Sequence, residues 1–153
     1  MNIEATLAAM QLSLPVLPPS KGIHRPCVEA GGLLYVSGHL PFRADGSLIT
    51  GKVGDSLTVE QGAEAARQCG IAMLASLKSH LGDLSRIQRL VKTLGMVNAV
   101  AEFEKHPEVI NGFSQLFVDL LGEEAGKGTR STVGMSSLPR GVVVEVEAVF
   151  LIS

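Results

Sequence analysis

The first third of the chain combines a short helical pattern with two β-prone runs. Apolar residues recur at helical spacing over residues 1–10, and the proline-rich stretch 15–19 then requires an extended connection. The β-prone runs 26–30 and 33–37 flank Gly31-Gly32, a pair that readily supplies the positive φ angles of a tight turn. We therefore expect a leader helix, an extended connection and a β-hairpin, with the second strand ended by Ser37-Gly38.

Two longer segments have the pattern of amphipathic helices. Thr58 and Gln61 have the spacing of a capping box, which predicts a helix over 59–81 that stops at the following glycine. A second helix is predicted over 107–121, with a proline in its first turn and with Gly122 as its end. The small residues of the first helix would let it lie close to a sheet, so it is expected to cover one.

The remaining β-prone segments complete the predicted architecture. Strands are expected over 87–97, where a helix is the alternative, and over 129–135 and 142–152. A polar, glycine-rich loop is expected over 123–128, and a turn near Pro139 should join the last two strands. The order is β-β-(β)-α-β-α-β-β, which fits an α+β sandwich. Its single sheet carries two helices on one face, and its other face needs a subunit interface as cover.

Composition narrows the class of protein. The chain has 153 residues and is 46% hydrophobic, which suits one domain over 1–153. A net charge of -2 leaves no broad basic field for nucleic acid or anionic membranes. Cys27 and Cys69 form no CxxC pair, and the N-terminus has no signal-peptide pattern, so a cytoplasmic protein with reduced thiols is expected.

Several motifs are too weak to indicate chemistry. The four histidines lack the HxxxH or HExxH spacing that would place two imidazoles on one metal, so no metal is expected. No serine has a GxSxG context, and neither cysteine has a local nucleophile signature. Residues 122–129 resemble a phosphate-binding loop, but a strand and not a helix follows them.

Arg130 stands out because it interrupts an otherwise small and apolar β-prone strand. A buried guanidinium needs a carboxylate from the protein or from a ligand. Glu145 and Glu147 are two residues apart in the last strand and therefore share one face. Arg130 is thus interpreted as a ligand-binding residue, as a structural ion pair with these glutamates, or as a solvated charge on an edge strand.

Four motifs occur together in an order that resembles the Rid/YjgF family. They are Val36-Ser37-Gly38-His39-Leu40-Pro41, then Asn111, then Arg130-Ser131-Thr132-Val133, and finally Leu138-Pro139 followed by Val144-Glu145-Val146-Glu147-Ala148. The similarity covers roughly residues 20–153, which implies that residues 1–20 are an N-terminal extension relative to the shorter family members and that the chain belongs to a longer subgroup. The resemblance implies a chorismate-mutase-like homotrimer with pockets between subunits. Active members of the family hydrolyse 2-imino acids to 2-oxo acids and ammonia, without a metal or organic cofactor.

The resemblance also implies roles for individual residues. Arg130 matches the arginine that grips the substrate carboxylate, and Glu145 matches the glutamate that holds or activates water. Three further residues match pocket-lining positions: Ser37, Gly38 and Asn111. Two positions depart from the family pattern. His24 stands where a tyrosine is common in the family, and Thr132 stands where a cysteine is frequent. Both are included among the expected substrate-binding residues.

Three functions are consistent with this pattern. The first is an imine deaminase, and the second is a non-catalytic module that binds a small carboxylate metabolite in the same cleft. The third is RNA cleavage, which the acidic balance and the lack of a basic, aromatic strip disfavour. The expected partners are therefore a 2-imino or 2-oxo acid and further copies of the chain, and neither nucleic acid nor a membrane.

Overall fold

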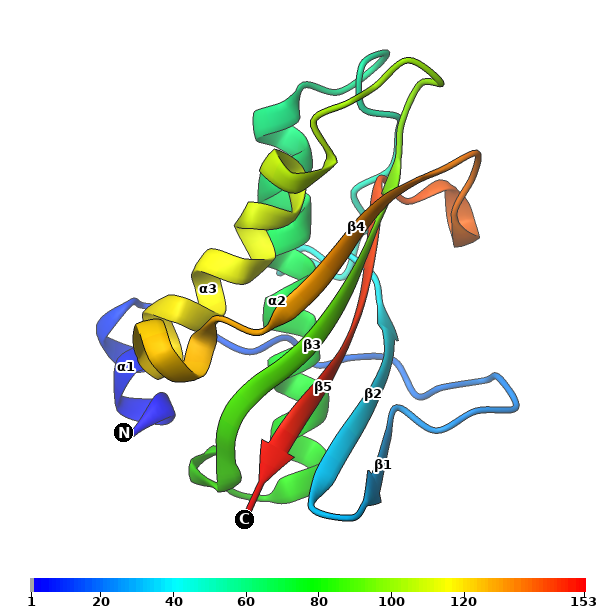
Figure 1. The fold of residues 1–153 in the computed structure, drawn as a ribbon. Helices are drawn as coiled ribbons and strands as arrows, with labels where there is room; N and C mark the ends of the chain where they lie inside the picture. Colours follow the sequence, from blue (N-terminus) through cyan, green and yellow to red (C-terminus); the bar gives the residue numbers. More distant parts are fainter. Residues whose placement is uncertain (1) are drawn as a thin grey trace.

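Five strands form one sheet in the order β1-β2-β5-β3-β4, and two long helices cover one of its faces (Figure 1). The computed structural model describes residues 2–153. The strands are β1 (Cys27–Ala30), β2 (Leu33–His39), β3 (Ile87–Asn98), β4 (Thr129–Met135) and β5 (Val144–Ile152). The helices are α1 (Ile3–Ala9), α2 (Val59–Leu81) and α3 (His106–Gly126), with short 3-10 turns η1 (Leu84–Arg86) and η2 (Pro139–Gly141).

All strand pairs are antiparallel except β3 and β4, which run parallel and are joined by α3. β4 is therefore an edge strand whose inner neighbour is β3. The predicted α+β sandwich, with one sheet and two helices on one face, is confirmed. Among residues 2–153, no helix is both long enough and apolar enough to cross a bilayer.

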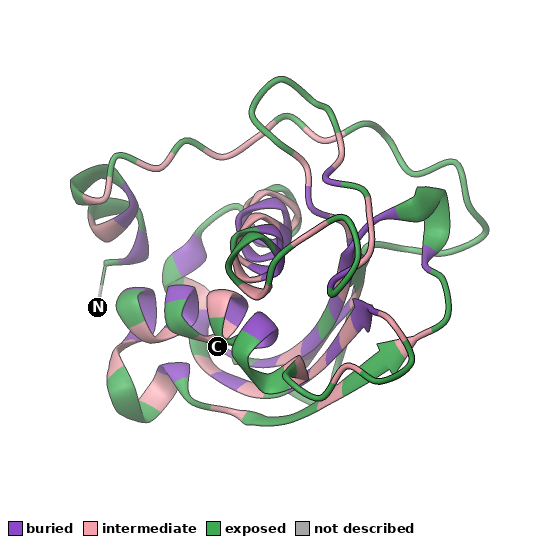
Figure 2. Cartoon of the chain, turned by 90° about the horizontal axis from the view of Figure 1, so that it is seen from above, coloured by how far each residue is buried: buried purple, intermediate pink, exposed green. Residues whose placement is uncertain are grey.

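Glycine and alanine let α2 and α3 touch along their backbones. A Cβ added at Gly112 would lie only 2.7 Å from the carbonyl carbon of Ala63 in α2. Near this contact, Phe117 of α3 packs between Phe113 of the same helix and Phe150 of β5, with ring centroids 4.8 and 5.3 Å apart. Figure 2 shows the buried residues concentrated where the helices meet the sheet. The capping box of α2 forms as predicted from Thr58 and Gln61.

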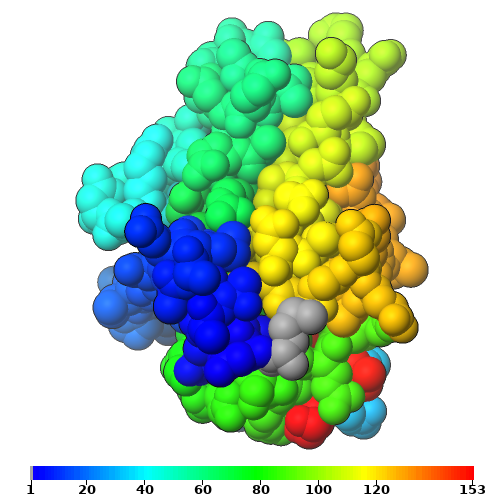
Figure 3. All heavy atoms as spheres, turned by 90° about the vertical axis from the view of Figure 1, so that its left-hand side faces the viewer, coloured from blue at the N-terminus to red at the C-terminus, as the bar shows by residue number. Residues whose placement is uncertain are grey.

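The N-terminal segment lies against the helical layer. Ile3 and Leu7 of α1 are buried, and Glu4 pairs with Lys78 of α2. The extended segment 12–26 then leads to β1, and Figure 3 shows the start of the chain beside α2 and α3. The predicted leader helix and extended connection are both present.

Some predicted boundaries were wrong. Strand β2 was predicted to end at Ser37-Gly38, but it continues to His39. The β2–β5 register shifts between Val36 and His39, so Ser37-Gly38 forms an irregularity within the strand. Gly122 breaks the helical angles (φ 82°, ψ 168°), yet one more helical turn follows where a loop was predicted over 123–128. Strand β5 begins at Val144 and not at 142, and the optional third strand before α2 is reduced to isolated bridges.

The face of the sheet opposite the helices carries exposed apolar side chains. Val28, Tyr35, Val133 and Leu151 are 48, 48, 37 and 36% exposed. Their registers with β5 and β3 place them on the same side as Glu145 and Glu147. We call this side of the sheet the open face. Several exposed apolar side chains on one face of a sheet are typical of a protein interface.

Candidate functional site

Arg130 lies on the edge strand β4 and points to the helical side of the sheet. Its pairing partner on β3 is the buried Thr93, and its Nη1 donates to Ser114 Oγ of α3 at 3.0 Å. Within residues 2–153, no carboxylate lies close enough to form an ion pair with it. The structural ion pair with Glu145 or Glu147 is therefore absent from the single chain. The remaining guanidinium N–H groups are available to a ligand carboxylate.

A cavity of about 400 Å³ opens beside Arg130, between β4, β3 and α3. Asn111 and Ser114 line it from α3, and Thr93 lines it from β3. Lys127 lines the same cavity, but its ammonium is already paired with Glu123. Asn111 and Arg130 thus line the same cavity, and of its two lining cations Arg130 is the one without an ion pair to a carboxylate among residues 2–153. We call this set of residues the arginine half-site.

Thr132 follows Arg130 by two residues, so both side chains project to the helical side of β4. Its pairing partner is Gly95, whose missing side chain leaves room for Ile110 of α3. Thr132 is half-buried and lies farther along the strand from the cavity that Arg130 lines. It therefore lies on the arginine side of the sheet without lining that cavity.

Glu145 occupies the open face, on the other side of the sheet. It pairs with Met96 of β3 and is half-buried. Burial raises the pKa of its carboxyl above the usual value, and the nearby charge of Glu147 raises it further. A carboxylate with a raised pKa is a stronger base than an exposed one, which suits a group that takes a proton from water.

Gly38 makes room for the Glu145 carboxylate. A Cβ at position 38 would lie 2.9 Å from Glu145 Cδ and would overlap Oε1. Gly38 sits at the irregularity of the β2–β5 pairing, between Val36 and His39. The glycine is therefore required by the position of the carboxylate and not by a turn. We call Gly38, Glu145 and Ser37 the glutamate half-site.

Ser37 holds the loop that carries His24. Its Oγ donates to the carbonyl oxygen of Arg25 at 2.6 Å, and its N–H donates to that of Pro26 at 2.9 Å. The His24 Nε2 lies 3.3 Å from Ser20 Oγ in an exposed stretch. Among residues 2–153, no hydrogen bond or ion pair joins His24 to another predicted site residue, and the Ser37 hydroxyl is used to position the loop.

Two functional features were missed by reasoning from the sequence. Ser114 orients Arg130, and only its position one turn after Asn111 could have suggested this. His39 is buried, its Nδ1 lies 2.7 Å from the carbonyl oxygen of Ser37, and its Nε2 lies 2.7 Å from Ser76 Oγ of α2. Burial lowers the pKa of His39, so the neutral ring links the irregular part of β2 to the helical layer.

Within a single chain, the predicted site residues therefore form two separate half-sites. Arg130, Asn111 and Thr132 lie on the helical side at the β4 edge, whereas Ser37, Gly38 and Glu145 lie on the open-face side. Strand alternation separates the two groups within one chain, so the cleft expected between subunits stays a prediction. Only a neighbouring copy of the chain can bring an arginine half-site to a glutamate half-site.

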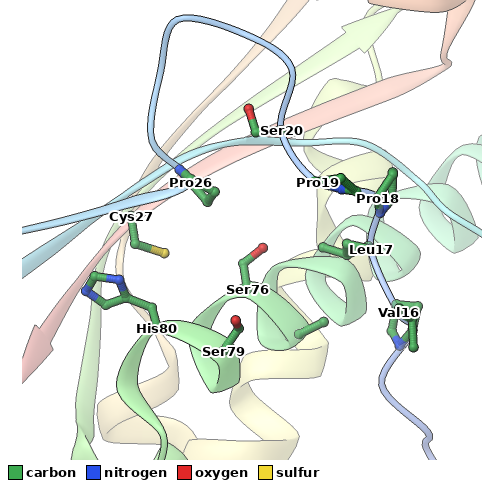
Figure 4. Close-up of a pocket in the computed structure, with 12 residues that line it drawn as sticks. Val16, Leu17, Pro18, Pro19, Ser20, Pro26, Cys27, Ser76, Ser79 and His80 are labelled. Carbon is green, nitrogen blue, oxygen red and sulfur yellow. The ribbon is translucent and has the colours of Figure 1, made fainter.

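A separate cavity of about 510 Å³ lies between the extended segment and α2 (Figure 4). Ser76, Ser79 and His80 line it from α2, and Cys27 lines it from β1. Burial raises the pKa of Cys27 to about 11, so its thiol stays protonated and is a poor nucleophile. None of the predicted site residues lines this cavity. Across residues 2–153, no group of three or more His, Cys, Asp or Glu side chains is placed to hold a metal ion.

The fold and the half-sites define a class of protein: a small α+β sandwich with an unpaired arginine at a sheet edge and a half-buried glutamate on the opposite face. A family model described as "YjgF/chorismate mutase-like, putative endoribonuclease" matches residues 4–149. The chain belongs to this family. It is also 37% identical over 147 residues to Protein TCP17 of Trypanosoma cruzi, covering 96% of this chain and 92% of that protein.

Solved structures share the fold to different degrees. The protein Atu1372 of Agrobacterium tumefaciens, described as having unknown function, is 40% identical with a TM-score of 0.89 over 99% of this chain and 94% of that one. RidA from the Antarctic bacterium Psychrobacter sp. is 26% identical with a TM-score of 0.60, covering 89% of this chain and 94% of that one. The chain is therefore more similar in shape to Atu1372 than to this RidA.

Proposed function

We propose that this protein is a hydrolytic deaminase that converts reactive 2-imino acids to 2-oxo acids and ammonia. The observation that carries the proposal is the Arg130 guanidinium, which faces a cavity, is oriented by Ser114 and has no protein carboxylate. A planar guanidinium binds a carboxylate through two parallel hydrogen bonds, and a 2-imino acid carries its carboxylate next to the reacting carbon. Membership of the family and the similarity to a protein named RidA support a role of the Rid/YjgF kind.

Glu145 is proposed to supply the water. The carboxylate takes a proton from water as the water oxygen attacks C2 of the imine. The same proton then passes to the imine nitrogen, which gives a carbinolamine and returns Glu145 to its charged form. Transfer of the hydroxyl proton toward nitrogen then breaks the C–N bond, releases ammonia and leaves a C2 carbonyl. An imine is already activated toward water, so positioning supplies most of the rate and no metal or organic cofactor is part of the proposal.

The proposed site lies between two subunits of a homotrimer in the cytoplasm. The arginine half-site of one chain would face the glutamate half-site of its neighbour, with His24 on the loop that Ser37 holds. The apolar open face supports close contact between copies, since Tyr35, Val133 and Leu151 are exposed in the single chain. Rings of identical heterologous contacts generate one such site per subunit.

The direct test is ammonia release from freshly generated 2-iminopropanoate and 2-iminobutanoate, with and without the protein. Imines hydrolyse slowly by themselves, so the expected result is faster release that scales with protein concentration. An Arg130→Lys variant is the matched control, because it keeps the charge and loses the planar fork. Equal release with wild type, with the variant and with buffer would overturn the proposal.

A second function is a non-catalytic module that binds a small carboxylate metabolite. It is favoured by the observation that the arginine half-site and its cavity are complete within one chain, whereas Glu145 lies outside them. Such a module would bind 2-oxo acids through Arg130 and would show no turnover. Binding of 2-oxobutanoate without accelerated release of ammonia would select this function over the deaminase.

A further inference from the structure

A cavity of about 790 Å³ lies between the N-terminal extended segment, the loop after β2 and the η2 turn. Three cationic side chains line it, and each comes from a different segment: Lys21, Arg43 and Arg140. Apolar lining is supplied mainly by Val16, Leu17 and Phe42. No aspartate or glutamate lines the cavity, although the whole chain has a net charge of -2. The cavity lining is therefore positively charged, although the chain as a whole has a negative net charge.

The three cations have no carboxylate partner within ion-pair distance anywhere in residues 2–153. Asp45 is the nearest acidic candidate, on the loop that carries Arg43. Its carboxylate is held by Ser47, whose N–H and Oγ donate to it at 2.9 and 2.6 Å. These bonds lower the pKa of Asp45 most, and Arg43 adds a weaker effect. The positive charge facing the cavity therefore remains largely uncompensated.

The backbone supports the use of these side chains by a ligand. Arg43 is oriented because its Nη1 donates to the carbonyl oxygen of Leu48 at 3.1 Å, which leaves its other N–H groups available. Arg140 has φ 59°, a left-handed conformation that favours glycine or asparagine over arginine. If only the backbone conformation mattered at position 140, glycine or asparagine would be favoured there. We therefore attribute the arginine at this position to its guanidinium group.

We propose that this cavity binds a small organic polyanion, a phosphate ester or a polycarboxylate, whose apolar part packs on Val16, Leu17 and Phe42. Guanidinium and ammonium groups converging from three segments suit a ligand with at least two negative charges. Such a ligand would fasten the N-terminal segment to the loop after β2 and to the η2 turn. The proposal does not depend on the deaminase activity, since Arg130 lines a different cavity.

Calorimetric titration of the full chain with phenyl phosphate, pyrophosphate and citrate tests the proposal. We expect saturable binding of at least one probe at concentrations up to about 10 mM, and an affinity at least about tenfold lower in Arg43→Gln and in Arg140→Gly. Glycine is compatible with the left-handed angles of position 140, so Arg140→Gly should fold at least as well as wild type. Tighter binding of phenyl phosphate or of citrate assigns the ligand to phosphate esters or to polycarboxylates.

Two matched variants keep the interpretation specific. Lys105→Gln removes an exposed positive charge outside the cavity and should leave the affinity unchanged. Arg130→Gln removes the proposed substrate arginine and should also leave it unchanged, which separates this site from the deaminase. The proposal is overturned if no probe binds saturably, if Arg43→Gln and Arg140→Gly bind like wild type, or if either control loses binding to the same extent.

Discussion

Arg130 and Glu145 project from opposite faces of the same sheet. Arg130 pairs with Thr93 and Glu145 pairs with Met96, and these two partners are three residues apart on β3. Successive side chains of a strand alternate between faces, so an odd separation places the two charges on opposite sides. The bond from Arg130 to Ser114 of α3 agrees with this assignment. A single chain therefore cannot apply both groups to one small substrate.

This relationship predicts complementation between two inactive variants. Arg130→Lys and Glu145→Gln should each be nearly inactive alone, because each lacks one half of every site. When the two are co-expressed and assemble at random, about a quarter of the sites should combine an intact Arg130 with an intact Glu145 from its neighbour. Deaminase activity of the purified mixed oligomers, followed by ammonia release, should recover to about that fraction of wild type.

The control for complementation is to mix the same two proteins after each has assembled separately. Activity should then stay low until subunits exchange or are refolded together. Mixed oligomers that remain as inactive as the parents would contradict a site shared between subunits. This outcome would leave the separate roles of the two residues to be decided by the single variants.

The single variants should separate binding from catalysis. Arg130→Lys should weaken both turnover and 2-oxo acid affinity, since an ammonium cannot reproduce the two-bond fork. Glu145→Gln should keep 2-oxo acid affinity and lower the deamination rate by about 100-fold or more, because acid–base assistance is lost. Titration calorimetry with 2-oxobutanoate and steady-state kinetics measure the two effects.

Stability provides the control for the Glu145 variant. The raised pKa of Glu145 means that its charged form is disfavoured in the folded protein, so this group's effect on stability becomes less favourable as the pH rises through its pKa. At neutral pH the neutral glutamine is thus expected to leave the melting temperature equal or higher. A large drop in melting temperature would show that lost activity in Glu145→Gln reports unfolding.

Gly38 should control the position of the catalytic carboxylate. An alanine there would overlap Glu145 Oε1 and force the side chain to move, since the added Cβ would lie 2.9 Å from Cδ. A displacement of about 1 Å can lower a rate by about 100-fold, so Gly38→Ala should reduce kcat by about one to two orders of magnitude. The 2-oxo acid affinity should be unchanged, because in the proposed site the substrate carboxylate is held by Arg130 of the neighbouring chain and not by the Glu145 side chain that moves. An undiminished kcat would show that Glu145 is not positioned through Gly38.

Local sequence patterns predicted most of the elements, but the arrangement of the site depended on pairing between distant strands. The Thr58–Gln61 capping box marked the start of α2 because both partners lie within one turn. Likewise, the spacing of Glu145 and Glu147 was enough to place them on one face. Which face holds Arg130 depends on the parallel register of β4 on β3, and nothing in the sequence near Arg130 specifies it. The chain also continues helically past Gly122, with Gly126 close to the backbone of Phe117 in the same element, whereas the polar, glycine-rich sequence of 123–128 indicated a loop.

The open face should bury its apolar residues between subunits. We expect wild type to sediment as a trimer, because Val28, Tyr35, Val133 and Leu151 expose apolar side chains on the same face of the sheet. Tyr35→Glu places a charge in that surface and should shift the population toward monomer at micromolar concentration. Val16→Glu is the matched control, since Val16 is 99% exposed on the N-terminal segment. A wild-type monomer in analytical ultracentrifugation would contradict both the trimer and the shared site.

The acidic limb of the pH profile should report the surroundings of Glu145. Its carboxylate must be deprotonated to accept a proton from water, so activity is present above its pKa and is lost as the pH falls through it. Burial raises this pKa above the ordinary value of 4.5, and Glu147 raises it further, so the loss should begin at a higher pH than for an exposed glutamate. Glu147→Gln removes the neighbouring negative charge and should move the limb of kcat to lower pH. Glu102→Gln removes an exposed charge from the loop before α3 and should leave the limb in place. A limb that stays fixed in Glu147→Gln, or that moves to higher pH, would show that the titrating group is not Glu145.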